Sequence, residues 1–139
     1  METSRRPYLQ SLAHRGFIQG VTISTPTGTS DLCRYFGGVR YALPPLQRWR
    51  RARPLPSTYS YGSRDQFGQC DGGARLCPQP GFMSLSPPNE DAWTEDCFQC
   101  NVWVPTGEAP KGGWPVFIFI RTCLALFQLR RYHVGISTD

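Results

Sequence analysis

The stretch TEDCFQCNVWVP, from Thr94 to Pro105, places two cysteines three residues apart at the start of an alternating run. From Phe98 to Val104, every second side chain is apolar, which predicts a strand with one buried face. Because side chains along a strand point alternately to opposite faces, Cys97 and Cys100 are poorly placed to bind one metal ion together. The stretch therefore predicts a structural strand.

Metal and redox chemistry require more than this cysteine pair. A structural zinc site needs four ligands, usually arranged as two close pairs. The candidates are Cys70, Cys77, Cys97 and Cys100, and the first two are seven residues apart. A thioredoxin-like pair lies at the start of a helix that follows a strand, whereas this pair precedes a strand. We predict one structural disulfide and one buried thiol, with no metal site and no cofactor.

The flanking sequence supplies further strands. FIQGVTI (17–23) and DLCRYFGGVRYA (31–42) predict two antiparallel strands joined by the turn TPTG (25–28). LPP (43–45) ends the second strand, because proline cannot donate to a ladder. PVFIFI (115–120) is apolar at every position, which is typical of a strand covered on both faces.

The remaining segments show little periodicity. Residues 1–15 predict a loose basic leader, and residues 57–89 contain no sustained helical or strand period. The chain holds 14 glycines and 13 prolines in 139 residues, which favours turns and loops within one domain at most. We expect few helices.

Charge and targeting signals are modest. The net charge is +5 and comes almost entirely from arginine. No signal peptide follows the basic start, and the apolar run 116–129 is interrupted by Arg121 and shorter than the roughly 20 residues of a transmembrane helix. Six cysteines nevertheless indicate an oxidising compartment, so the localisation stays open.

Two clusters invite functional interpretations. RWRRARP (48–54) combines arginines with Trp49, as nucleic-acid-binding segments do. No zinc finger, helix-turn-helix or RNA-recognition motif accompanies it, so we predict a solvated loop with Trp49 packed inward and no nucleic-acid partner.

GISTD (135–139) lacks the second glycine of a G-x-S-x-G nucleophile elbow, and nearby His133 and Ser137 have no orienting carboxylate.

Six segments, in order, resemble the type-B carboxylesterases and lipases, the cholinesterase-like branch of the α/β-hydrolases. These segments are GFIQGVTI (16–23), RYFGGVRYALPP (34–45), RWRRARPLP (48–56), CPQ (77–79), TEDCFQCNVWVP (94–105) and PVFIFI (115–120). In the same order, the first segment is similar to the family's opening strand, and the next two are similar to its F-x-G-I-P-Y-A-x-P-P and L-R-F-x-x-P-x-P motifs. The fourth is similar to the segment with the family's first cysteine, and the fifth to its S-E-D-C-L-x-L-N-V-x-x-P motif. The sixth is similar to the strand before the oxyanion loop. Arg40 stands where the family usually has proline, Gln47 lies near the place of a glycine, and Cys100 replaces an apolar residue.

The resemblance implies a disulfide between Cys77 and Cys97, worth on the order of 3 kcal/mol. It leaves Cys33, Cys70, Cys100 and Cys123 unassigned. It also implies an incomplete α/β-hydrolase fold, made of the N-terminal strands and loops of a mixed central sheet. The domain organisation would be a leader (1–15), the N-terminal portion of a carboxylesterase type-B domain (16–120) and a divergent tail (121–139).

The resemblance implies a serine ester hydrolase that takes a carboxylic ester and uses no cofactor. Ile120 is followed by Arg-Thr-Cys in place of the family's H-G-G-G, and no nucleophile, acid or base position is present. We therefore predict no catalytic residue and no activity from this fragment alone. We expect residues 121–139 to derive from a shifted frame, a retained intron or a misjoined exon. The alternative is a non-catalytic interaction protein on an esterase-like scaffold.

Overall fold

The computed structural model describes residues 3–47, 49–78 and 94–120. The chain divides into two units, of which the first holds described residues 3–47, 49–78 and 94–108, and the second holds described residues 109–120. The first unit is an antiparallel sheet with long irregular connections, and the described residues contain no α-helix. None of the described segments forms a helix with the length and hydrophobicity that a bilayer crossing requires.

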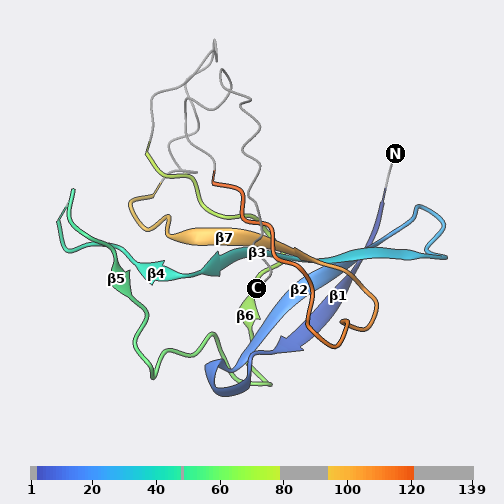
Figure 1. The fold of residues 1–139 in the computed structure, drawn as a ribbon. Coiled ribbons are helices and arrows are strands. Elements are labelled where there is room, and N and C mark those ends of the chain that lie inside the picture. Colours follow the sequence, from blue (N-terminus) through green and yellow to red (C-terminus); the bar gives the residue numbers. More distant parts are fainter. Residues whose placement is uncertain (1–2, 48, 79–93, 121–139) are drawn as a thin grey trace, which may run out of the picture. The chain divides into compact units, whose positions relative to one another are not determined.

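The main sheet has the strand order β1-β2-β3-β7, with every neighbouring pair antiparallel (Figure 1). Its strands are β1 (Ser4–Ser11), β2 (Phe17–Ser24), β3 (Asp31–Arg40) and β7 (Gln99–Val104). A short strand, β6 (Gly68–Gln69), pairs in parallel with the start of β2. A separate two-stranded ribbon joins β4 (Ala42–Leu43) to β5 (Arg53–Pro54).

Strand β1 lies where the sequence predicts a loose leader, and that prediction is wrong for Ser4–Ser11. The strand pairs with β2 along its whole length, from Ser4 opposite Ser24 to Ser11 opposite Phe17. Most of its side chains are exposed, so no hydrophobic period reveals it. Pro7 is compatible with this position because β1 is an edge strand. A 3-10 turn, η1 (Ala13–Arg15), then leads into β2.

The predicted pair of strands at 17–23 and 31–42 is confirmed by β2 and β3. The predicted turn between them is present, since Gly28 N donates to Thr25 O at 2.8 Å. Gly28 has a φ of 70°, a left-handed conformation that glycine adopts without strain. Strand β3 ends at Arg40, shortly before the Leu-Pro-Pro segment.

The predicted strand at 98–104 is confirmed by β7, which pairs with β3 from Arg34 opposite Val104 to Arg40 opposite Gln99. The register shifts between Phe36 and Val39. This irregularity contains Gly37, whose N–H donates to Cys70 O at 2.7 Å instead of to β7. The break in the ladder therefore attaches the irregular middle of the chain to the sheet.

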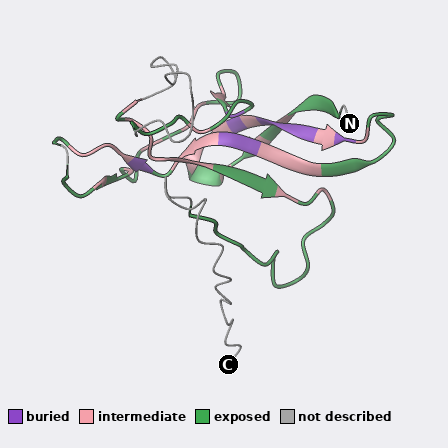
Figure 2. Ribbon diagram, turned by 90° about the horizontal axis from the view of Figure 1, so that it is seen from above, coloured by how far each residue is buried: buried purple, intermediate pink, exposed green. Residues whose placement is uncertain are grey.

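The core is small and lies on β2, β3 and the segment after β6. Ile18, Phe36 and Cys70 form its buried centre, and the purple stretches in Figure 2 lie mainly on β2 and β3. Partly buried side chains pack around it, namely Tyr8, Leu12, Val39, Tyr61 and Val104. A core of this size limits the stability of the unit.

The second unit contains no strand among its described residues. A turn closes where Gly113 N donates to Pro110 O at 2.8 Å. The predicted strand PVFIFI is not formed, and Val116 to Ile120 are 73–84 % exposed. The prediction of a strand covered on both faces is therefore wrong for this structure.

Candidate functional site

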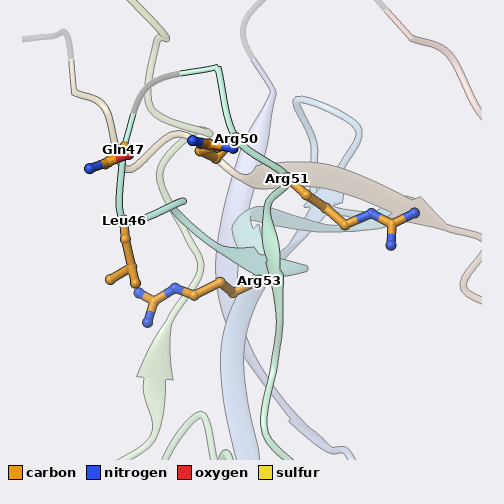
Figure 3. Close-up of a pocket in the computed structure, with 5 residues that line it drawn as sticks. All are labelled: Leu46, Gln47, Arg50, Arg51 and Arg53. Atoms are coloured by element: carbon orange, nitrogen blue, oxygen red, sulfur yellow. The ribbon is translucent and has the colours of Figure 1, made fainter.

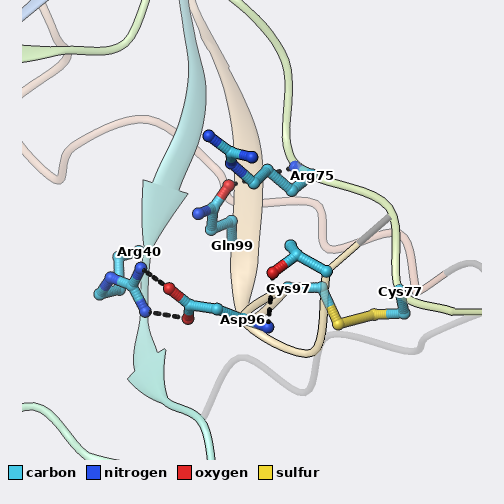
Figure 4. The surroundings of a disulfide bond; sticks show 7 residues. Arg40, Arg75, Cys77, Asp96, Cys97 and Gln99 are labelled. Atoms are coloured by element: carbon cyan, nitrogen blue, oxygen red, sulfur yellow. Dashed lines mark hydrogen bonds and ion pairs between the residues drawn. A yellow bond between two sulfur atoms is a disulfide. The ribbon is translucent and has the colours of Figure 1, made fainter. Parts of the chain in front are cut away.

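Arg40 and Asp96 form the central contact of the TEDC corner, the segment Thr94–Cys97 (Figure 4). Two guanidinium nitrogens of Arg40 donate to the two carboxylate oxygens of Asp96. The hydrogen bond from Arg40 lowers the pKa of Asp96, and the same bond raises the pKa of Arg40. Bidentate charge-assisted pairs fix geometry as well as adding energy. This pair therefore orients the TEDC corner against the end of β3.

The backbone of the same corner is also held by local and distant contacts. Asp96 N donates to Thr94 Oγ1 at 3.1 Å, and Gln99 N donates to Cys97 O at 2.8 Å. Thr94 N donates to Leu76 O at 2.9 Å. On the β3 side of the ion pair, the hydroxyl of Tyr61 donates to the carbonyl of Arg40 at 2.5 Å. Burial raises the pKa of Tyr61, so this phenol stays a neutral hydrogen-bond donor. These contacts join the corner to β3 and to the segment before Cys77.

The disulfide expected from the resemblance is present. Cys77 and Cys97 are bonded, their Cα atoms lie 5.2 Å apart, and their sequence separation is 20. Figure 4 shows the disulfide beside the Arg40–Asp96 pair. The sequence therefore identified a true covalent feature of the fold.

Two side-chain amides of β7 hold the segment before Cys77. Asn101 Oδ1 accepts from Gly38 N at 3.1 Å and from Ala74 N at 2.9 Å. Gln99 Oε1 accepts from Arg75 N at 3.1 Å. These contacts explain how a segment without any period is ordered, because its backbone hydrogen bonds go to side chains.

The free thiols occupy different environments. Cys70 is buried in the core, and burial raises its pKa. Cys100 is only half-buried, so this thiol is less enclosed than the sequence predicts. Burial also raises the pKa of Cys100, and its Sγ lies 3.6 Å from Val39 O. Cys33 is half-buried on β3. Raised thiol pKa values disfavour the thiolate that acts as nucleophile or metal ligand.

Metal-ligating and catalytic groups do not come together in the part of the chain that the structure describes. The described residues contain no group of three or more His, Cys, Asp or Glu side chains suited to a metal ion. His14 lies exposed in η1. His133, Ser137 and Cys123 lie outside the described residues.

The arginine-rich segment forms the loop between β4 and β5. A pocket of about 410 Å³ lies at this loop and is lined by Leu46, Gln47, Arg50, Arg51 and Arg53 (Figure 3). Arg53 Nε donates to Pro44 O at 2.9 Å, which holds the base of the loop. Trp49 is 96 % exposed, so the prediction that it packs inward is wrong. The described residues offer no apolar surface that covers this indole.

Sequence reasoning identified the disulfide but missed the ion pair and the amide contacts. The signal available was weak: Gln99 and Asn101 occupy the polar positions of the alternating run, and Arg40 departs from the expected proline. Alternation predicts which face is polar but does not identify the partner of each polar group.

Residues 9–124 match the model of the carboxylesterase family. A carboxylic ester hydrolase of Gibberella moniliformis is 41 % identical over 119 residues, covering 84 % of this chain and 21 % of the relative. An uncharacterised esterase/lipase of Schizosaccharomyces pombe is 37 % identical over 121 residues, covering 83 % of this chain and 21 % of the relative.

Not every relative carries a hydrolase name. Human thyroglobulin is 31 % identical over 125 residues, covering 81 % of this chain and 4 % of its own length. No solved structure matches the chain. The chain spans about a fifth of the length of the two fungal relatives. With the family match extending through the sheet, the disulfide and the TEDC corner, this chain belongs to the carboxylesterase family.

Proposed function

We propose that residues 16–120 are the N-terminal part of a carboxylic-ester hydrolase with an α/β-hydrolase fold, and that this chain does not hydrolyse esters by itself. The family match and the fungal hydrolase relatives support the reaction class. The mainly antiparallel sheet is compatible with the first strands of such a fold. The substrate of the complete domain is a carboxylic ester.

The observation that carries the proposed inactivity is the sequence after Ile120. Ester hydrolysis by a serine enzyme requires a serine activated by a histidine, a carboxylate that orients the histidine, and N–H donors for the oxyanion. The resemblance places His-Gly-Gly directly after the apolar segment, and this chain has Arg121, Thr122 and Cys123 there. His14 cannot substitute, because it is exposed and has no polar partner among the described residues.

The residues that are ordered have a supporting role in this proposal. The Cys77–Cys97 disulfide and the Arg40–Asp96 pair fix the start of β7 against the end of β3. Strand β7 in turn precedes the apolar segment that leads to the oxyanion loop in the family. The chain thus supplies framework, while the attacking and stabilising groups belong to the rest of the domain. The disulfide favours an oxidising compartment.

Labelling with a serine-directed fluorophosphonate tests this proposal. We expect no covalent adduct on the purified 139-residue chain, while the Gibberella moniliformis relative serves as the positive control. A stoichiometric adduct on one serine that does not form when the chain is denatured before labelling would contradict the proposed inactivity. Mass spectrometry of the intact chain gives the stoichiometry directly.

A second candidate is a non-catalytic interaction protein on the same scaffold. The match to thyroglobulin, a relative without a hydrolase name, is the observation that favours it. This candidate requires a chain that is stable by itself. A secreted monomer with one sharp thermal transition and no serine labelling would support it over the fragment interpretation.

A further inference from the structure

The loop between β4 and β5 carries two adjacent arginines, Arg50 and Arg51. Both side chains are exposed, and so is the side chain of Trp49 before them. Neither arginine has a carboxylate partner among the residues that the structure describes. The two guanidinium groups are therefore free to bind carboxylates that another molecule supplies.

These guanidinium groups do not converge on one small anion. Figure 3 shows the Arg51 side chain extending away from Arg50 and from Arg53. Arg53 lies at the base of the loop, where its Nε donates to Pro44 O at 2.9 Å. A partner that uses Arg50 and Arg51 must therefore hold each of them in a separate acidic subsite.

The backbone beside the two arginines is open as well. Arg50 N donates to Gln47 O at 3.3 Å, but the peptide groups of Arg51 and Ala52 make no hydrogen bond to another described residue. Trp49 has a φ of 66°, in the left-handed region that bulky residues rarely adopt. Extending the loop would relieve this strain, and an extended segment can pair with the edge of a partner's strand.

Adjacent arginines occur at three places in the sequence, and the loop pair differs from the one at Arg5 and Arg6. That pair lies within β1, which is hydrogen-bonded along its length to β2, and Pro7 follows it directly. A proline after the arginine hinders cleavage, because its ring fixes the backbone and removes the N–H. The pair at 130–131 lies outside the described residues. The bond after Arg51 has neither obstacle.

We infer that the Arg51–Ala52 peptide bond is a limited-proteolysis site for a serine endoprotease that recognises paired arginines. Such a protease holds guanidinium groups with carboxylates in its subsites, and the exposed pair supplies those groups. Water adds across the amide bond, which leaves a carboxylate on Arg51 and an ammonium group on Ala52. Exposed loops are where folded chains are nicked without losing their fold.

Cleavage at this bond leaves two pieces that the sheet holds together. Residues 1–51 contain β2 and β3, and residues 52–139 contain β6 and β7. Strand β3 pairs with β7, β2 pairs with β6, and Phe36 and Cys70 pack in the shared core. No disulfide joins the pieces, because the first piece has a single cysteine, Cys33, which is free. The pieces should therefore separate in denaturant without reduction.

Digestion of the full chain at low concentration by a kexin-type endoprotease, which cleaves after paired basic residues, tests the inference. We expect a new N-terminus at Ala52, formed at a rate within about tenfold of that for a synthetic peptide of residues 46–55. Mass spectrometry identifies the two pieces. They should co-elute from a size-exclusion column in buffer and separate in urea without a reductant.

Arg51→Gln should slow cleavage at this bond about a hundredfold or more, because the acidic subsite loses its charged partner. Arg64→Gln is the matched control, since Arg64 is exposed in another loop and the substitution removes the same charge. It should leave the rate unchanged. A chain that stays intact while the peptide is cut, or equal rates for Arg51→Gln and the unsubstituted chain, would overturn the inference. So would separation of the two pieces in buffer.

Discussion

Arg40 at the end of β3 binds both carboxylate oxygens of Asp96, the acid of the TEDC corner. Arg40 occupies a position where proline is usual in the family, and proline has no charged side chain for this contact. The Asp96 side chain is 41 % exposed and that of Arg40 is 19 % exposed. The pair therefore lies at the rim of the sheet, partly screened by solvent.

Asp96→Asn should lower the free energy of unfolding by about 1 kcal/mol at neutral pH, near the upper end for solvent-screened pairs. The pKa of Asp96 is lowered in the folded chain. The contribution is therefore complete above the ordinary aspartate pKa of about 3.9 and is lost as the pH falls through the lower folded pKa. Urea unfolding at pH 7 and at low pH, followed by tryptophan fluorescence, measures both values.

The control for this substitution is Asp65→Asn, because Asp65 is exposed and has no polar partner among the described residues. It should change the free energy of unfolding by less than about 0.5 kcal/mol. Equal destabilisation by Asp65→Asn and Asp96→Asn, or a difference that persists at low pH, would contradict the role given to the pair.

Replacing both Cys77 and Cys97 by serine should destabilise the first unit by about 3 kcal/mol, because the disulfide restricts a loop of this length in the unfolded chain. Urea unfolding of the oxidised chain and the double variant gives the difference. Cys33→Ser removes a half-buried free thiol and should have a much smaller effect. If reduction by dithiothreitol left the unfolding curve unchanged, the disulfide would have no such role.

Gly37→Ala should detach the segment 70–75 from the sheet. A Cβ atom at Gly37 would lie 2.0 Å from Gly72 O, a backbone atom that moves only with its segment. Overpacking of this kind lowers the free energy of unfolding by about 1–3 kcal/mol. The amide hydrogen at position 37 should exchange faster in the variant, because its hydrogen bond to Cys70 O would be weakened. Gly107→Ala is the control, since a Cβ atom there would have no neighbour within 4 Å. Identical exchange profiles for the two variants would refute the contact.

The isolated chain should be poorly soluble, because Val116–Ile120 exposes an uncharged, β-prone surface. Ile118→Lys should raise the soluble concentration several-fold and reduce light scattering, and it provides a background for the unfolding measurements above. Leu32→Lys adds the same charge outside the segment and should help less. A wild-type chain that stays monomeric at high concentration and melts in one sharp transition would contradict this expectation.

The alternating stretches were predicted accurately from the sequence. Strands β2, β3 and β7 lie where the apolar runs predict strands, and β2 has the expected buried face. Strand β7 does not, because none of its residues is buried and Val102 and Trp103 are exposed. The family motifs also identified the Cys77–Cys97 bond, which spacing alone left among 15 possible full pairings.

Other features were not predictable for physical reasons. Strand β1 is held mainly by backbone pairing at a sheet edge, which leaves little trace in its side chains. Trp49 is exposed and no strand forms at 116–120, and both features depend on the neighbouring surfaces. The spacing of apolar residues in the sequence does not show which surfaces are near. The division into residues 1–15, 16–120 and 121–139 remains a prediction, as does the absence of a nucleic-acid partner.

Steady-state hydrolysis of p-nitrophenyl acetate by the purified chain measures whether these residues carry esterase activity by themselves. We predict a rate that rises linearly with ester concentration, equals that of a denatured sample, and does not respond to a serine-directed inhibitor. Saturable turnover that the inhibitor abolishes would instead show that the chain contains its own catalytic serine.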